Sequence, residues 1–551
     1  MSDDALGPLA PAQRREASER IRTRAAESHA DTPAPEHHSN GDDERYAGQN
    51  HYATFSKGLQ HDPATGEVTA ASYASLRAAL MSGRPSDFEE VILGVPAAQS
   101  AKLTDPQAGL AFALEGIDGH QLTLPPCYAF RSKGAIGEIA ENYWLALCRG
   151  VPFINYATDP LIAQAAADLN RYAVFDGPKA GGAVTPATAF RANAPGALAG
   201  PYLSQFMIND IPYGSQRTPA RIAYGVPAPA GGGYMTDEAS WLAVQNGTAP
   251  TIKPGPLPNP SLLHDGQGLG DYVHIDELFQ AYLNACLLLI TPRARGGFGV
   301  SVSDDNPYKN SRTQVGFGTL GEPNFKVLVA EVATRALKAV WFQKWYVHRR
   351  IRPEAYAGRL HWHLKGARSY EFDAAELAKL EAGPLAHPTI VAAQHFLPMA
   401  FPEGSPTHPA YGAGHATVAG ACVTVLKALF KTDVTLASLG VPVMQPNADG
   451  TALVPYAGAD RDALTVGGEL DKLAANVGIA RNFAGVHWRS DYSESVKLGE
   501  QVAYYFLQDT VQTYNEDIAF SWREMDGTPR QVSKVALPAP LLERVFAAEA
   551  V

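Results

Sequence analysis

One long segment without proline or glycine limits what this chain can fold into. Residues 324–350 are rich in alanine, and no helix-breaking residue follows until the dipeptide Arg352-Pro353. Proline disfavours α geometry in the residue before it, so this boundary is typical of a helix end. The segment therefore predicts a single long helix that stops beside a cluster of basic residues.

Further helices are predicted along the second half of the chain. Residues 271–290 carry apolar side chains at helical spacing. Another helix is expected to start near Gly414, and residues 469–484 form a further candidate. The pattern Asp491-x-x-Glu494 is typical of a capping box and predicts the start of the last long helix. Strand signals are few, so the predicted fold class is all-α, with helices packed as bundles.

The first half of the chain is less regular. Apolar residues at helical spacing predict helices over 135–149 and 162–175, whereas residues 185–270 are crowded with glycine and proline and indicate long ordered loops. The N-terminal residues are polar, with too few apolar side chains for a core. We therefore expect three regions: a polar N-terminal tail over 1–49, an N-terminal helical region with long loops over 50–300, and a C-terminal helical bundle with the functional site over 301–551.

Composition excludes several classes of function. The chain has 45 Lys and Arg against 56 Asp and Glu, a formal net charge of −11, which disfavours binding to nucleic acids or anionic membranes. No apolar run is long enough to span a bilayer, and no apolar core follows the charged N-terminus as in a secretory signal. The four cysteines lie far apart and are expected to be buried free thiols of a reducing compartment. These features predict a cytoplasmic protein without a nucleic-acid or membrane partner.

Three clusters of basic residues stand out in the second half. Lys344 and Arg352 flank the end of the predicted long helix, and Arg481 precedes His487 by six residues. Between them, a turn containing Gly414 leads directly into a helix, whose free N–H groups and positive dipole end favour an anion. Each cluster alone has an ordinary explanation, because basic residues at helix ends commonly bind carbonyls and a lone buried histidine is usually structural.

Together the clusters predict a site for a tetrahedral oxyanion. Arg352 and Arg481 offer planar pairs of donors, and Lys344 offers a point charge. A backbone N–H at Gly414 completes the set, because glycine lets an anion approach closely. Of the two histidines in the second and third clusters, one would meet the central atom as a ligand or a nucleophile. The other would move a proton near neutral pH.

These motifs resemble those of the vanadium-dependent haloperoxidases. The pattern is K-x7-RP, then a Gly-His turn, then R-x5-H, and acid phosphatases of the phosphatidic-acid-phosphatase type share it. The stretches KWYVHRRIRPEA, SPTHPAYGAGHAT and GVHWRSDYSES are more similar to the peroxidases, particularly the algal bromoperoxidases and their bacterial relatives. Less specific stretches such as FSKGLQHD, SQFMIND and WLAVQNG extend the resemblance over nearly the whole chain.

The resemblance implies an architecture and a reaction. The fold would be two four-helix bundles with long Gly/Pro-rich loops, with the active site on the C-terminal bundle, and the chain would form a homodimer or a larger homo-oligomer. Vanadate would be the cofactor. Hydrogen peroxide would oxidise a halide, bromide rather than chloride, to hypohalous acid through a peroxovanadate, and a small organic acceptor would be halogenated.

The resemblance also implies which residues bind the cofactor. His487 would be the metal ligand through a ring nitrogen. The vanadate oxygens would be bound by Lys344, Arg352, Arg481 and the Gly414 N–H.

Three catalytic residues and a halide pocket follow from the same resemblance. His415 would hydrogen-bond the apical oxygen and act as acid and base, and Lys344 would polarise the peroxide. His408 matches a second histidine of the algal bromoperoxidases, which an aromatic residue replaces in the fungal chloroperoxidase. Trp341 lies where the family lines its halide pocket together with that histidine.

One departure from the family leaves alternatives open. The usual turn is Pro-Ser-Gly-His, with the serine hydroxyl bonding a vanadate oxygen, whereas Ala413 stands in the serine position here. A charge-assisted hydrogen bond is worth roughly 1.5–3 kcal/mol, so vanadate affinity is expected to fall by an order of magnitude or more. An acid phosphatase, with His487 as the phosphorylated nucleophile and His415 as the acid, fits the same site. A non-redox homologue catalysing an acid–base rearrangement and a non-catalytic anion-binding scaffold are further alternatives.

Overall fold

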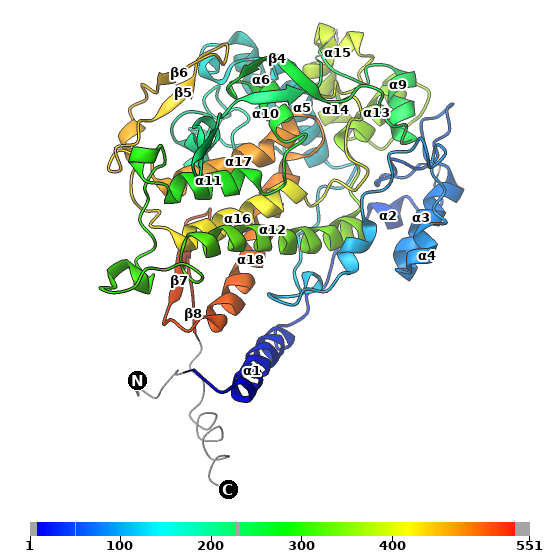
Figure 1. The fold of residues 1–551 in the computed structure, drawn as a ribbon. Coiled ribbons are helices and arrows are strands. Elements are labelled where there is room, and N and C mark those ends of the chain that lie inside the picture. Colours follow the sequence, from blue (N-terminus) through cyan, green and yellow to red (C-terminus); the bar gives the residue numbers. More distant parts are fainter. Residues whose placement is uncertain (1–7, 50, 228–231, 535–551) are drawn as a thin grey trace.

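Helices are the main regular elements of the computed structural model, which describes residues 8–49, 51–227 and 232–534 (Figure 1). The predicted all-α class is confirmed, and the short strands of the described residues form only two-stranded antiparallel pairs. The helices of the first half are α1 (Pro11–Ala30), α2 (Asp42–Arg45), α3 (Ala70–Ser82), α4 (Pro85–Phe88), α5 (Lys133–Cys148), α6 (Pro160–Leu169), α7 (Pro195–Leu198), α8 (Gln205–Ile208), α9 (Glu238–Gln245), α10 (Gly266–Tyr272) and α11 (Gln280–Ile290). Those of the second half are α12 (Glu322–Phe342), α13 (Pro353–Leu364), α14 (Ala374–Glu381), α15 (Pro388–Ala392), α16 (Gly414–Leu429), α17 (Val466–Phe483) and α18 (Arg489–Thr513).

The strand pairs lie in the connections between helices. Two of them, with the short helices α7, α8 and α9, fall within the Gly/Pro-rich 185–270 segment that was predicted as loops. A third lies between α16 and α17, and a fourth follows α18. The strand pairs are β1 (Ile211–Tyr213) with β2 (Gln216–Thr218), β3 (Ile222–Gly225) with β4 (Gly255–Ser261), β5 (Met444–Pro446) with β6 (Leu453–Pro455), and β7 (Ala519–Arg523) with β8 (Pro529–Ser533).

Helix α16 lies at the centre of the second half and contacts α12, α17 and α18 (Figure 1). Nearly every residue of α16 is buried, so it is apolar on all sides, as expected for a helix enclosed by others. A Cβ at Gly420 would overlap the carbonyl oxygen of Val496, and one at Gly499 would overlap that of Thr417. The backbones of α16 and α18 are therefore in direct contact, and this contact fixes their relative position.

The long helix predicted over 324–350 is present with a change of winding at its end. Helix α12 continues into a π-helical turn, Gln343–His348, and Arg349 then adopts a left-handed conformation with φ 42°. Because a π turn holds more residues than an α turn, it changes the direction in which the following side chains project. Lys344 lies in this turn, so the irregular winding sets the position of a predicted site residue.

Two sequence predictions of helix boundaries are wrong. The helix expected over 271–290 is divided into α10 and α11, because the carbonyl of Val273 and the carboxylate of Asp276 bond to other elements. Asp491 is not the residue that precedes α18, as the pattern predicted. It lies at the third position of the helix, in the first turn, where its carboxylate caps the helix start by accepting the N–H of Trp488 at 3.0 Å.

The N-terminal segment predicted as a polar tail contains α1 and rests on the body at a few points. His29 at the end of α1 pairs with Asp509 of α18 at 2.9 Å, and Asp43 forms an ion pair with Arg349. Figure 1 shows α1 projecting from the rest of the molecule. Residues 1–7 and 535–551, which belong to the first and third predicted regions, lie outside the described residues, and the division into two four-helix bundles stays a prediction.

Two expectations from the sequence concern the cysteines and membrane-spanning helices. The four cysteines are buried and unpaired, as predicted. Within the described residues, none of the helices is long and apolar enough to cross a membrane.

Burial of Glu500 predicts a pH-dependent cost to stability. The carboxyl accepts the N–H of Met525 at 2.7 Å, and burial raises its pKa from 4.5 to about 7. A raised folded-state pKa means that stability is fully present below pH 4.5 and is lost as pH rises through 7. Glu500→Gln keeps an acceptor for Met525 and is expected to stabilise the protein by roughly 2–3 kcal/mol at pH 8. Thermal unfolding at pH 8 and pH 4.5 measures the difference, which should nearly vanish at the lower pH. Glu494→Gln, which removes a partly exposed carboxyl paired with Lys497 on the same helix, is the control variant.

Candidate active site

The predicted site residues come together where the segment between α12 and α13, the start of α16, the end of α17 and the turn before α18 meet. Lys344 and Arg352 lie on either side of the break between α12 and α13, and Gly414 begins α16. Arg481 lies near the end of α17, and His487 lies in the turn that leads into α18. We use the term cradle for six residues: Lys344, Arg352, Gly414, His415, Arg481 and His487.

The two cations of the first motif are held by backbone carbonyls. Lys344 is fully buried, and its Nζ donates to the carbonyl oxygens of Pro409 and Ala410 at 2.8 and 3.1 Å. Arg352 is 1% exposed and donates to the carbonyls of His408 and Val486 at 2.8 and 2.7 Å. Carbonyls orient these groups without supplying a negative charge, and burial, followed by repulsion from Arg352, lowers the pKa of Lys344 well below its usual range. A bound anion would favour the charged form of Lys344.

The tautomer of His487 follows from its two partners. Its Nδ1 lies 2.8 Å from the carboxylate of Asp491, and its Nε2 lies 3.1 Å from Nη1 of Arg352. Arginine can only donate, so Nε2 accepts this bond and Nδ1 carries the proton that Asp491 accepts. His487 therefore presents a lone pair at Nε2, toward the cations of the cradle. Burial, followed by repulsion from Arg352, lowers the pKa of His487 well below its usual range and favours this neutral form.

The loop between α10 and α11 supplies contacts that the sequence did not predict. Nη1 of Arg481 donates to the carbonyl of Val273 at 2.7 Å. Three residues along, the Asp276 carboxylate lies 3.1 Å from Nε2 of His415. His274, between them, contacts Glu403 at 2.5 Å and stacks on Phe401 with ring centroids 3.7 Å apart, which fixes the loop. His415 is thus held by its Nε2, and its Nδ1 has no hydrogen-bond partner among the described residues.

The start of α16 offers three unpaired amides. The first hydrogen bond of the helix runs from the Thr417 N–H to the carbonyl of Ala413. The N–H groups of Gly414, His415 and Ala416 have no acceptor among the described residues, as is usual for a first turn. A Cβ at position 414 would lie 3.0 Å from the ring of Trp341, so a larger residue there would crowd this ring.

The residues predicted for the halide pocket adjoin the cradle. The rings of Trp341 and His408 lie 4.9 Å apart, and Nζ of Lys344 lies 5.6 Å from the Trp341 ring. Nδ1 of His408 accepts from Nη2 of Arg352 at 2.9 Å, so the proton of this imidazole is on Nε2. Burial and repulsion from Lys344 lower the pKa of His408 well below its usual range.

The cradle holds an uncompensated positive charge. None of Lys344, Arg352 and Arg481 has a carboxylate within ion-pair distance among the described residues, whereas the other buried lysines and arginines do, Arg149 excepted. Burial is the main reason that the pKa of Arg352 is lowered to about 9 and that of Arg481 to about 10. Three buried cations without counter-ions are costly in an empty protein, and a bound anion would remove that cost.

Two functional candidates were missed in the sequence. Asp491 follows His487 by four residues, and that spacing within one helical turn could have indicated the contact. Asp276 lies 139 residues before His415, and no local pattern identifies it.

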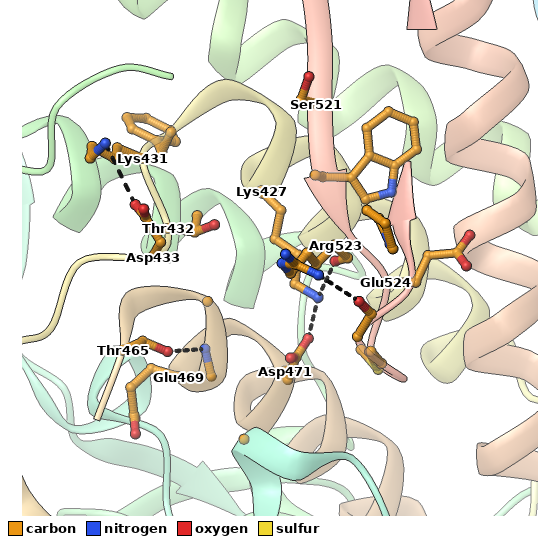
Figure 2. A pocket seen from close by; sticks show the side chains of 18 of the residues that line it. Lys427, Lys431, Thr432, Asp433, Thr465, Glu469, Asp471, Ser521, Arg523 and Glu524 are labelled. Atoms are coloured by element: carbon orange, nitrogen blue, oxygen red, sulfur yellow. Dashed lines mark hydrogen bonds and ion pairs between the residues drawn. The ribbon is translucent and has the colours of Figure 1, made fainter. Parts of the chain in front are cut away.

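A separate cavity lies near the C-terminal end of α16 and the N-terminal end of α17 and has a volume of about 890 Å³ (Figure 2). Lys427 pairs there with Asp471, and Lys431 with Asp304. The amides in the first turn of α17 are bonded to Val434, Thr432 and Thr465. The lysines and amides of this cavity are thus already satisfied, unlike those of the cradle at the opposite ends of the same two helices.

Helices enclosing a buried, cation-rich oxyanion site with two histidines define a class of oxyanion-binding enzymes. The family model described as the VCPO second helical-bundle domain matches residues 325–516, which include the six cradle residues. The chain is 34% identical to the vanadium-dependent bromoperoxidase of Corallina pilulifera over 555 residues, 87% of this chain and 91% of that one. It is 33% identical to the vanadium-dependent bromoperoxidase of Ascophyllum nodosum, over 96% of this chain and 94% of that one.

A solved structure shows the same fold. The homohexameric second vanadate-dependent bromoperoxidase from Ascophyllum nodosum superposes with a TM-score of 0.85 at 28% identity and covers 96% of this chain and 92% of that one. The chain therefore belongs to the vanadium-dependent haloperoxidase family, as its motifs predicted. It is a haloperoxidase.

Proposed function

We propose that this chain binds vanadate in the cradle and uses hydrogen peroxide to oxidise halide to hypohalous acid, which halogenates a small organic acceptor. The observation that carries the proposal is a set of three buried basic side chains beside three helix-start amides, for which the described residues supply neither a carboxylate partner nor an acceptor. A tetrahedral oxyanion with several negative oxygens is complementary to such a set. Bound vanadate supplies Lewis acidity that activates the peroxide without redox change at the metal.

The chain's own residues have distinct roles in this proposal. His487 offers the lone pair of Nε2 as the metal ligand, and Asp491 keeps the proton on Nδ1. Lys344, Arg352 and Arg481 neutralise the oxyanion, and the Gly414 N–H donates to one of its oxygens.

Proton transfer falls to His415. Asp276 accepts the proton of its Nε2, which leaves Nδ1 able to take a proton from the peroxide and return it to the product. Lys344 also serves catalysis, because its ammonium polarises a bound peroxide oxygen toward attack by the halide.

We further propose bromide as the preferred halide. His408 adjoins Trp341 and Lys344 where a halide would approach, and the relatives named above are bromoperoxidases. A higher kcat/KM for chloride than for bromide would contradict this preference.

A halogenation assay on purified protein tests the proposed function. Hydrogen peroxide, bromide and a β-diketone acceptor are supplied with and without orthovanadate, and bromination is expected only with vanadate. Phosphatase activity on a phosphate ester is measured in parallel. Ester cleavage without bromination would replace the haloperoxidase proposal with the phosphatase alternative. Turnover of neither substrate would leave the non-redox homologue and the non-catalytic anion-binding scaffold.

Ala413→Ser tests the departure from the family turn. The added hydroxyl is expected to donate to a vanadate oxygen and to tighten binding roughly tenfold, in line with one charge-assisted hydrogen bond. Isothermal titration of the metal-free protein with orthovanadate measures the change. Ala410→Ser, at a second buried alanine of the same segment, is the matched control and should not tighten binding.

We also propose a homo-oligomer, with a homodimer as the smallest form. The support is the homohexameric structure of the Ascophyllum nodosum relative. Light scattering of the purified protein measures the assembly, and a monomer would contradict it.

A further inference from the structure

The turn that leads into α16 is fixed by a hydrogen bond to a side chain of α18. The N–H of Ala413 donates to Oγ of Ser495 at 2.7 Å, and Ser495 is fully buried two turns into α18. The carbonyl of Ala413 is fixed as well, because it accepts both the N–H and the hydroxyl of Thr417, at 3.0 and 2.9 Å. Both polar backbone groups of the residue before Gly414 are therefore constrained.

The Ser495 hydroxyl occupies the space that a side chain at position 412 would need. A Cβ at Gly412 would lie 2.6 Å from Oγ of Ser495 and 2.7 Å from Leu124, so a larger residue would displace the hydroxyl from Ala413. The family's usual proline at this position would meet the same obstruction. Gly412, Ala413 and Ser495 thus form one arrangement, distinct from a turn that carries its own serine hydroxyl.

Anchoring Ala413 determines where the next amide points. Ala413 has an extended backbone, with φ −86° and ψ 123°. The N–H groups on either side of an extended residue point in opposite directions. Since the Ala413 N–H points toward α18, the Gly414 N–H points away from α18 and is free to meet a ligand.

The same helix fixes both sides of the cradle. Asp491 and Ser495 are four residues apart on α18, so they project from one face. Asp491 orients His487, while Ser495 orients the turn that carries Gly414. The backbone contact of α16 with α18 at Gly420 and Gly499 keeps these two points at a constant separation.

We propose that Ser495 is a positioning residue of the oxyanion site, which holds the Gly414 amide in its ligand-binding direction and offsets the absence of a serine hydroxyl at position 413. This inference rests on the proposed function only in requiring that the cradle binds a tetrahedral oxyanion. It concerns equilibrium binding, so it can be tested without turnover.

The test is titration of the metal-free full-length chain with orthovanadate and, separately, with inorganic phosphate. Ser495→Ala is expected to weaken both anions about 3- to 10-fold, the effect of one hydrogen bond. Ser493→Ala removes a hydroxyl of the same helix that bonds to Glu494 and, among the described residues, to no cradle residue, so it should leave both affinities unchanged. Ser495→Thr keeps the hydroxyl and should restore most of the wild-type affinity.

Each outcome supports or overturns the inference. If Ser495→Ala lowers the melting temperature but binds both anions as tightly as the wild type, the residue is only structural and the inference is wrong. Equal weakening by Ser493→Ala would also overturn it. If the wild type binds neither anion, the oxyanion site itself fails. If it binds both anions without brominating, only the proposed reaction fails.

Discussion

Replacing His487 with alanine is expected to remove vanadate-dependent bromination, with a loss well over 100-fold. The variant deletes the nitrogen that presents its lone pair among the cations, and loss even of a residue that only supports a metal ligand typically costs 10–100-fold. Asp491 and Arg352 would keep their other contacts, so the fold should persist. The assay is bromination of a β-diketone at saturating peroxide, with bound vanadium measured by elemental analysis.

His61→Ala is the matched control for that variant. His61 is also buried, burial lowers its pKa to about 3, and it bonds to Leu59 and Ser56 rather than to a cradle residue. Removing it should cost stability without reducing the vanadium content per folded chain. Retention of full activity by His487→Ala would contradict the assignment of the metal ligand.

The second large effect is expected from Lys344→Met compared with Lys57→Met. Both lysines are buried, but Lys57 pairs with Glu354 at 2.7 Å, whereas Lys344 bonds only to carbonyls. Lys344→Met removes an uncompensated cation and is expected to weaken vanadate binding by at least 100-fold, about 2.7 kcal/mol or more. Lys57→Met leaves a buried carboxylate without its partner and should destabilise the fold by about 3–5 kcal/mol.

Thermal unfolding with and without orthovanadate separates the two variants. A ligand at 100 times its Kd stabilises a protein by about 2.7 kcal/mol, so wild type and Lys57→Met should both melt higher when vanadate is added. Lys344→Met should melt above Lys57→Met in the absence of the anion and gain nothing from its addition. An equal gain in Lys344→Met would show that this ammonium does not contact the ligand.

The sequence predicted the helical scaffold and the residues of the cradle more fully than their supports. Segments with clear helical spacing, such as 324–350 and 469–484, correspond to α12 and α17 because burial of one face governs local structure there. The break at residues 273–279 was missed, since only tertiary partners turn the Val273 carbonyl and the Asp276 carboxylate out of the helix.

The supports of the site were only partly predicted. Asp491 was interpreted as the residue that opens α18, whereas it lies in the first turn, and its carboxylate contacts both the N–H of Trp488 and the ring of His487. Ala413 was identified as a departure from the family, but its bond to Ser495 crosses 82 positions of the chain. Such pairs become visible only when two helices are placed in contact.

The loop between α10 and α11 limits how the C-terminal family domain can be isolated or exchanged with that of a relative. The family domain spans residues 325–516, yet Val273 and Asp276, which hold Arg481 and His415, precede it in the chain. A fragment cut at the domain boundary would retain the six cradle residues with two of them unsupported. A chimaera that exchanges this domain with a relative must therefore carry residues 273–276, and the Glu403–His274 contact that fixes them, from the same parent.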